Sequence, residues 1–394
     1  MKNLIIMYSF LKQNILPILI IILMTTALLF ILISLWCQVL YTQYMKNIYT
    51  DAPDLKNSIY FHCNENPTES KDDILNEISS FPGFDKVINY AETSIECDNI
   101  SNFLSMKTYC YNHDMIANFK LDVSDGRWLS NDSDKVEIVI YGDELSEVPI
   151  GKTILLDNSI YATVVGRVAY NILPDFSLSS PNYNTSDFFR QSSNCGFIIN
   201  SDMIDENYYT DHNSNYQYQG AFICLNNNAT YNEKTDIINY LSDYGNVNDY
   251  DTVINNTDKL FETWAGMLLP LPLFLLIICT ISLLSLSAII IKRSMNEQAK
   301  YYLIGCSKTK SVSLLASSLT FVFSLPSIIN IILIVFFPDF LRKDTLWDTS
   351  KSILNFWSFV PLFIYLAFII SFVIISSIAF YKKHSPLSFY RRNL

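Results

Sequence analysis

Residues that carry most enzyme and metal chemistry are scarce in this chain of 394 residues. The four histidines, at positions 62, 113, 212 and 384, are scattered and lack the close spacing of metal ligands. Neither an H-E-x-x-H zinc motif nor a G-x-S-x-G nucleophile motif occurs. We therefore expect no catalytic, cofactor-binding or metal-binding residue, and we interpret the chain as a protein other than an enzyme.

Charged residues are absent from four long apolar runs, which cover residues 15–37, 267–291, 312–337 and 356–381. A helix needs about 20 apolar residues to cross the hydrocarbon core of a bilayer, and each run is long enough. Because no run contains an ionisable side chain, the sequence offers no proton relay or ion site within the membrane. We predict an α-helical membrane protein with four transmembrane helices, one near the start and three near the end.

Acidic residues gather in the long polar segment between the first two runs, residues 38–266. Residues 41–262 contain 34 acidic and 13 basic side chains, a net charge of −21, whereas the rest of the chain carries +10. Eleven of the fourteen bases outside this segment flank the runs at residues 2–12, 292–310 and 382–392. The other three lie in the connection 338–355, where three acids balance them. Since lysine and arginine mark cytoplasmic loops, we predict a multi-pass protein of the cell membrane with both termini in the cytoplasm and the acidic segment outside.

The acidic segment has enough regular apolar patterning to predict a folded α+β domain. We expect strands at residues 58–63, 86–91, 136–141, 154–156 and 159–166, and helices at residues 72–80 and 236–244. Residues 170–193 and 208–219 are rich in loop-forming residues, so we expect two long loops there. Tyr41, Tyr44 and Tyr49, which follow the first run, suit the aromatic belt at the outer membrane interface.

Four short motifs in this domain occur in the order typical of one family: DGRWLS at 125–130, EIVIYGD at 137–143, PIGKTILL at 149–156 and VVGRV at 164–168. In this order, between a first and a second membrane helix, they resemble the extracytoplasmic domain of MacB-type ABC transporter permeases. Gly126, Gly151 and Gly166 are expected to supply turns with positive φ between the strands.

A second resemblance lies in the cytoplasmic connection after the second run, residues 292–311. MacB-type and FtsX-type permeases have here a base, a glutamate, an apolar turn, a glycine and a further base, and the connection contacts a separate ATPase. The resemblance implies coupling roles for Arg293, Glu297, Tyr301, Ile304, Gly305 and Lys308. The alternative is that the bases of this connection only face anionic lipid headgroups. Pro270 and Pro272, near the outer end of the second run, are a candidate hinge; ordinary packing kinks are the alternative.

The segment Gly305-Cys306-Ser307-Lys308-Thr309 is not a nucleotide-binding loop, because the glycine directly before the lysine and the earlier glycine of G-x-x-x-x-G-K-[ST] are missing. By resemblance, ATP and magnesium are expected on a separate ABC ATPase subunit. The expected assembly contains a second permease, identical or paralogous, within membrane lipid and without nucleic acid, and a bacterial source is expected.

The resemblance implies a permease subunit that transmits ATPase-driven motion across the membrane (mechanotransmission) to an outer domain that handles a peptide, drug or lipid-linked substrate. The acidic domain suggests cationic cargo such as an antimicrobial peptide. Two alternatives stay open: an FtsX-like regulator of an outer cell-wall hydrolase, and a passive membrane receptor. Five of the eight cysteines lie in the acidic domain without a C-x-x-C motif, so either one or two disulfides or buried thiols are expected.

Overall fold

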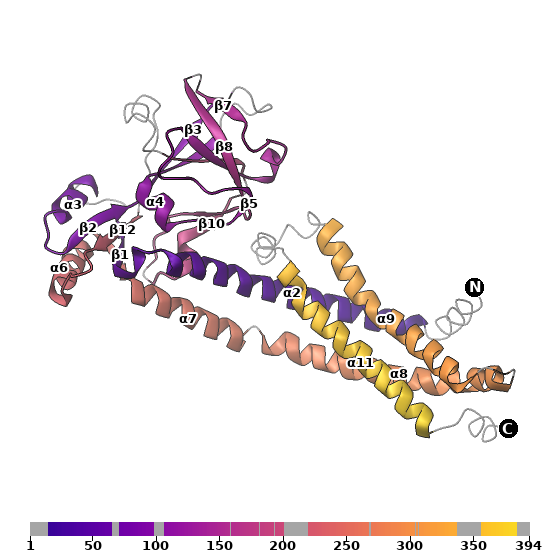
Figure 1. The fold of residues 1–394 in the computed structure, drawn as a ribbon. Coiled ribbons are helices and arrows are strands. Elements are labelled where there is room, and N and C mark those ends of the chain that lie inside the picture. Colours follow the sequence, from indigo (N-terminus) through magenta and orange to yellow (C-terminus); the bar gives the residue numbers. More distant parts are fainter. Residues whose placement is uncertain are drawn as a thin grey trace. The chain divides into compact units, whose positions relative to one another are not determined.

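The structure, a computed structural model, describes residues 15–64, 71–97, 106–157, 159–180, 182–192, 194–200, 220–267, 269–303, 305, 307–336 and 356–383 (Figure 1). The chain divides into two compact units. The insert domain is Tyr41–Glu262, and the helical unit comprises Met1–Leu40 and Thr263–Leu394. The predicted loop at 208–219 and the residues 338–355, for which the sequence predicts a short extracellular loop, lie outside the described residues.

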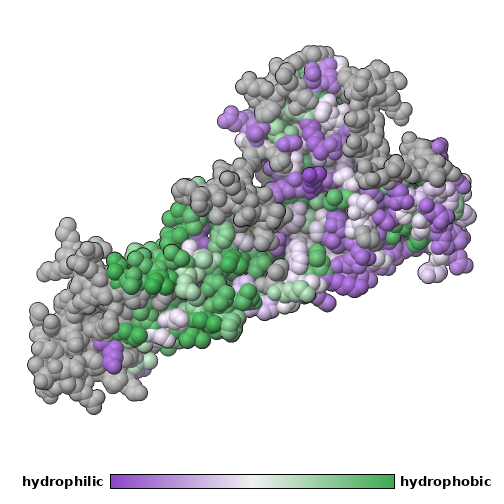
Figure 2. Space-filling view, turned by 180° about the vertical axis from the view of Figure 1, so that it is seen from behind, coloured by the Kyte–Doolittle hydropathy of each residue, from purple (hydrophilic) through white to green (hydrophobic). Residues whose placement is uncertain are grey.

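The helical unit is built from long apolar helices, which are α2 (Ile15–Asp51), α8 (Pro270–Leu303), α9 (Lys308–Phe336), η6 (Phe356–Phe359) and α11 (Val360–Lys383). Three described helices are long and apolar enough to cross a membrane, Ile18–Asp51, Ala316–Phe336 and Phe356–Ala379, while α8 has a shorter apolar stretch, Pro270–Leu286. Hydrophobic side chains gather over this unit and hydrophilic ones over the insert domain (Figure 2). These helices fit the predicted arrangement of one span followed by three.

Interlocking leucine, isoleucine, valine and phenylalanine side chains form the core of the helical unit. Pro326 lies inside α9, where its ring removes one backbone hydrogen bond. The side chain of Asn330 donates to the carbonyl oxygen of Pro326 at 2.9 Å and to that of Thr26 on α2 at 3.1 Å. Asn330 thus joins two apolar helices at the proline, in the way that polar side chains bridge membrane helices.

The insert domain contains a four-stranded antiparallel sheet in the order β13 (Gly245–Asp249), β1 (Ser58–Cys63), β12 (Gly220–Leu225) and β2 (Phe84–Ile88). Helices α3 (Lys71–Ile78) and α6 (Tyr231–Ser242) cover one face. Every residue of β1 is buried, since Ile59, Phe61 and Cys63 pack under these helices while the alternate residues face an aromatic cluster.

The second, seven-stranded sheet runs in the order β3 (Tyr90–Ile95), β4 (Met106–Tyr111), β11 (Gly196–Asn200), β6 (Glu137–Tyr141), β8 (Ile160–Val168) and β5 (Val123–Gly126), with β7 (Thr153–Leu156) also on β8. The pairs β4–β11 and β6–β8 are parallel and the others antiparallel. Isoleucines and valines of β6, β8 and β11 fill its core.

The remaining elements are η1 (Leu55–Asn57), α4 (His113–Asn118), η2 (Asp143–Leu145), β9 (Ile172–Pro174), η3 (Thr185–Phe188), β10 (Phe189–Gln191) and α7 (Tyr250–Met267).

Most of the predicted elements are confirmed, and two are wrong. The segment 86–91 is divided between β2 and β3, which belong to different sheets. The predicted loop at 170–193 contains η3 and the paired strands β9 and β10. Both errors arise because strand pairing between separate segments decides these elements, and the apolar pattern within one segment does not predict such pairing.

The three motif glycines have two different roles. Gly126 and Gly151 have φ of +80° and +85°, as predicted, but Gly166 lies in the extended strand β8. A Cβ on Gly166 would lie 2.1 Å from the carbonyl oxygen of Arg127, so the reason for this glycine is close backbone packing. Gly126 and Gly166 pair directly across β5 and β8, which brings two of the four motifs together.

Candidate functional site

The connection between α8 and α9 is a short turn with a glycine at its bend. Helix α8 ends at Leu303, Gly305 has φ of +99°, and α9 begins at Lys308. A glycine in this conformation commonly follows a helix end, because other residues are strained there. The hydroxyl of Ser307 accepts from the backbone N–H of Lys310 at 3.4 Å and so caps the next helix.

The predicted coupling residues lie on both sides of this turn. Arg293, Glu297 and Tyr301 belong to α8, and their spacing of four residues places these positions along one helix face. Lys308 is the first residue of α9, whereas Ile304 lies outside the described residues. The coupling role of all six residues stays a prediction.

The predicted hinge prolines lie at the start of a helix rather than within one. Helix α7 ends at Met267 and α8 begins at Pro270, with Pro272 in its first turn. Proline is well tolerated there because the first N–H groups of a helix have no partner within it. The chain thus has a boundary between two helices at the expected position, and hinge motion stays a prediction.

Helix α2 continues into the insert domain beyond the predicted span. Tyr41, Met45, Ile48 and Tyr49 are all at least 91% buried and follow the spacing of one helix face. The ring of Tyr49 stacks on Phe188 and on Tyr250, with centroids 5.5 and 5.2 Å apart. Tyr49 is therefore a core residue of the insert domain, which corrects its assignment to the aromatic belt. The helical spacing was the signal that could have identified it.

The first turns of α7 are fixed in the same part of the insert domain. Lys46 Nζ on α2 lies 2.5 Å from Asp258 Oδ1 on α7. Thr257 Oγ1 accepts from the backbone N–H of Thr185 at 2.9 Å. Together with the Tyr49–Tyr250 stack, these contacts attach both helices to the insert domain.

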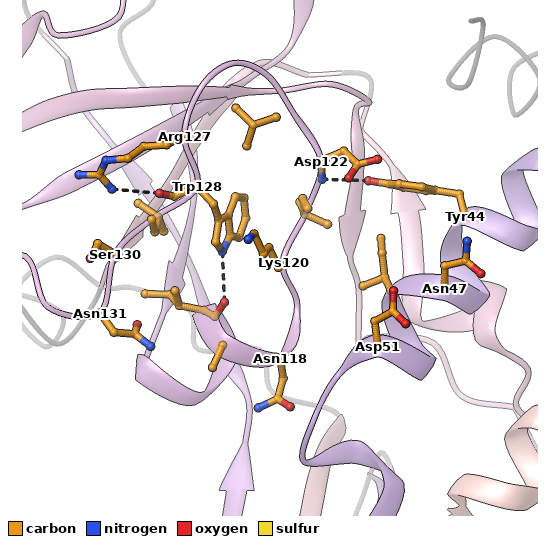
Figure 3. A pocket seen from close by; sticks show the side chains of 16 residues that line it. Tyr44, Asn47, Asp51, Asn118, Lys120, Asp122, Arg127, Trp128, Ser130 and Asn131 are labelled. Atoms are coloured by element: carbon orange, nitrogen blue, oxygen red, sulfur yellow. Dashed lines mark hydrogen bonds between the residues drawn. The ribbon is translucent and has the colours of Figure 1, made fainter. Parts of the chain in front are cut away.

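A cleft of about 980 Å³ opens in the insert domain beside the end of α2 (Figure 3). Tyr44, Asn47 and Asp51 form one wall, and segment 116–131, from α4 to the residues after β5, forms the other. The backbone N–H of Asp122 donates to Tyr44 Oη at 3.3 Å and joins the two walls. The motif analysis identified part of segment 116–131 but not the cleft.

An ion pair holds the motif segment at this cleft. Arg127 Nη1 donates to Glu137 Oε2 on β6 at 2.9 Å, Nη2 donates to Glu137 Oε1, and the backbone N–H of Ser130 donates to Oε2 at 3.1 Å. Burial by itself raises the pKa of Glu137, but these hydrogen bonds and the guanidinium charge outweigh it and lower the pKa below its ordinary value. Glu137 thus stays ionised and fixes residues 127–130.

A second ion-pair network fixes α4 under the cleft. Lys86 Nζ lies 2.8 Å from Asp54 Oδ2 and 2.6 Å from Asp114 Oδ1. Asn118 Nδ2 donates to Asp54 Oδ2 at 2.8 Å, and Asn118 Oδ1 accepts from the backbone N–H of Asp54 at 3.0 Å. Burial disfavours the charge on Lys86, yet the two carboxylates raise its pKa above the ordinary value. The network is a structural support for the wall that includes Asn118.

The cysteines within the described residues are buried thiols, at positions 37, 63, 97, 110, 195, 224 and 279. Of the two predicted possibilities, the structure shows buried thiols, and it shows no disulfide among these seven. Burial raises the pKa of Cys224 to about 12. Among the described residues, no group of three or more histidine, cysteine, aspartate or glutamate side chains forms a potential metal site.

No protein-family model and no curated protein matches the chain. Among solved structures, the chain is similar to the extracellular domain of the noncanonic ABC-type transporter YknZ from Gram-positive bacteria. That match has 13% identity and a TM-score of 0.28, and it covers 46% of this chain and 87% of that one. The periplasmic region of MacB from Actinobacillus actinomycetemcomitans matches with 14% identity and a TM-score of 0.31, over 54% of this chain and 94% of that one. Both neighbours are outer domains.

Proposed function

We propose that this chain is the permease subunit of an ABC transporter. In this proposal, a separate ATPase subunit binds the turn between α8 and α9, and a second permease completes the assembly. The chain transmits ATPase-driven motion to the insert domain, which handles a peptide, drug or lipid-linked substrate at the outer face of a cell membrane. The chain itself holds no ATP or magnesium.

The observation that carries this proposal is the continuity of α2. It runs as one helix from Ile15 to Asp51, with an apolar part in the helical unit and an end packed into the insert-domain core through Met45 and Tyr49. A helix resists bending more than a loop does, because each turn is hydrogen-bonded to the next. A displacement of its membrane part is therefore passed on to the domain. Helix α7 is also attached to the insert domain, through Asp258 and Tyr250, but it ends at Met267 before α8 begins, so α2 is the continuous connection.

The turn at Gly305 supports an ATPase contact. It is short, is flanked by bases of α8 and α9, and has a backbone conformation that favours glycine. A short, basic turn is suited to inserting into an acidic groove of a partner. This part of the proposal also rests on the family pattern at Arg293, Glu297, Tyr301, Ile304, Gly305 and Lys308.

The test is the ATPase activity of the partner that co-purifies with the chain. Glu297→Lys and Gly305→Lys should abolish stimulation of the ATPase while leaving membrane insertion intact. Gln298→Lys is the matched control, because it adds the same charge one residue further along α8, off the 293–297–301 face. Unchanged stimulation in both test variants would contradict the docking assignment. Recovery of no ATP-binding partner would favour the passive-receptor alternative.

A further inference from the structure

The cleft beside α2 offers hydrogen-bond acceptors that no donor of the described protein uses. Asn131 Oδ1 is buried and has no hydrogen-bond partner. Asp51 and Asp122 are exposed at the cleft, and no ion pair joins either carboxylate to another side chain within the described ranges. A buried acceptor without a donor is destabilising, so a ligand that brings a donor is favoured there.

The two cations of the cleft are Arg127 and Lys120. The Arg127 guanidinium binds Glu137 through both terminal nitrogens and also donates to the carbonyl oxygen of Trp128 at 3.0 Å. Its positive charge is therefore already balanced by a buried carboxylate. Lys120 is the remaining cation of the lining, against the two carboxylates Asp51 and Asp122. With Arg127 balanced by Glu137, which lies outside the lining, two carboxylates remain in the cleft against one cation.

The cleft also has an apolar floor. Ile48, Ile116, Leu121, Trp128 and Leu129 line it and are each at least 91% buried. Trp128 is held in place because its Nε1 donates to the carbonyl oxygen of Ile116 at 3.1 Å. A volume of about 980 Å³ exceeds what a single ion or amine fills, and it lies at the upper end for small-ligand pockets.

We propose that this cleft binds a cationic amphipathic peptide, with amino or guanidinium groups at Asp51 and Asp122 and an apolar side chain on the floor beside Trp128. Backbone N–H groups of the peptide supply the donor for Asn131. The net charge of −21 on residues 41–262 raises the local concentration of such a ligand. Binding is a property of the insert domain alone. That the peptide is cargo rests on the proposed function.

The experiment measures peptide binding to the purified full chain in non-ionic detergent, without any ATPase. The probe is a fluorescent eight-residue peptide of alternating lysine and leucine, followed by anisotropy. The comparison ligands are the glutamate–leucine peptide of the same length and the polyamine spermidine, which lacks apolar side chains. We expect the lysine–leucine peptide to bind at least tenfold more tightly than either comparison ligand.

The decisive variant is Asp51→Asn with Asp122→Asn, which we expect to weaken binding about tenfold, or about 1.4 kcal/mol. The matched control is Asp236→Asn with Asp243→Asn on and next to α6, because both are exposed acids of the same domain and the charge change is equal. We expect this control to change binding less than twofold. Equal weakening in both double variants would show attraction by the overall charge only, and would overturn the site.

Other outcomes also decide the proposal. Unchanged binding in the Asp51/Asp122 variant, or equally tight binding of the glutamate–leucine peptide, would overturn it. Equally tight binding of spermidine would reassign the cleft to polyamines. Because the ATPase takes no part in this experiment, loss of this proposal leaves the permease function standing. If the peptide binds but the co-purification test recovers no ATP-binding partner, the cleft stands and the permease function is rejected.

Discussion

Replacing Arg127 by methionine should destabilise the motif segment at the cleft. The substitution keeps an unbranched side chain but leaves Glu137, whose side chain is 6% exposed, as a buried carboxylate without its cation. Breaking a buried ion pair in this way costs about 3–5 kcal/mol. Because the Arg127 side chain is 53% exposed and water can replace part of it, we expect about 2 kcal/mol.

Hydrogen exchange of the full chain in detergent measures this loss locally. Where exchange follows the opening equilibrium, 2 kcal/mol corresponds to about 30-fold faster exchange for amides of residues 123–141. In the double variant Arg127→Met with Glu137→Gln, the unpaired charge is gone, so exchange should return to within about fivefold of the native rate. Peptides from α6 serve as the internal control and should not change.

The pH dependence of the same variants tests the electrostatic cause. In the native chain the pKa of Glu137 is lowered, so its stabilisation is complete above the unfolded pKa of about 4.3 and is lost as the pH falls through the folded pKa. In Arg127→Met, Glu137 is buried without its cation, which raises the pKa of Glu137. The loss of stability of this variant relative to the native chain should therefore shrink as the pH falls toward 4. A destabilisation that does not depend on pH, or a double variant as unstable as the single one, would refute the reasoning.

Two substitutions and one chemical-modification experiment test the packing of the insert domain. Tyr49→Ala should lower stability by about 3–5 kcal/mol, because a fully buried ring is lost, whereas Tyr161→Ala, at 72% exposure, should change the melting temperature little. Gly166→Ala should lower the melting temperature and loosen residues 123–130 in hydrogen exchange, because its Cβ would lie 2.1 Å from a carbonyl oxygen. Cys224, whose pKa is raised to about 12 by burial, should resist alkylation at pH 8 in the native chain and react after denaturation, as mass spectrometry would show.

Local patterning predicted the elements whose apolar residues alternate or recur within one short segment. Residues 58–63 were expected as a strand and form β1 with the same bounds, and residues 154–156 fall within β7. Strands β9 and β10 were missed because each has three residues and is defined by its partner, with Pro174 opposite Phe189. The turn between α8 and α9 was predicted at Gly305, where φ is +99°, while its coupling role stays a prediction.

The cleft could not be predicted from the sequence, because its walls come from segments that are far apart in the chain. Asp51 lies at the end of α2, and Asp122 lies in the segment between α4 and β5. Asp51 and Asp122 line the same cleft for two reasons. Strand β5 pairs with β8 through Gly126 and Gly166, and Tyr44 Oη accepts a hydrogen bond from the backbone N–H of Asp122. No sequence pattern in either segment predicts that the other segment lies beside it.

The sequence by itself determined the four apolar runs and the charge of the segment between the first two, since the length of an apolar run and the sum of charges need no knowledge of packing. Tertiary structure decided where α2 stops being a membrane helix and becomes part of a domain core. The same amphipathic turns, with Tyr41, Met45 and Tyr49 on one face, would suit a membrane interface or a protein core equally well. The stacking of Tyr49 between Phe188 and Tyr250 settles that choice, because only the folded domain brings those rings together.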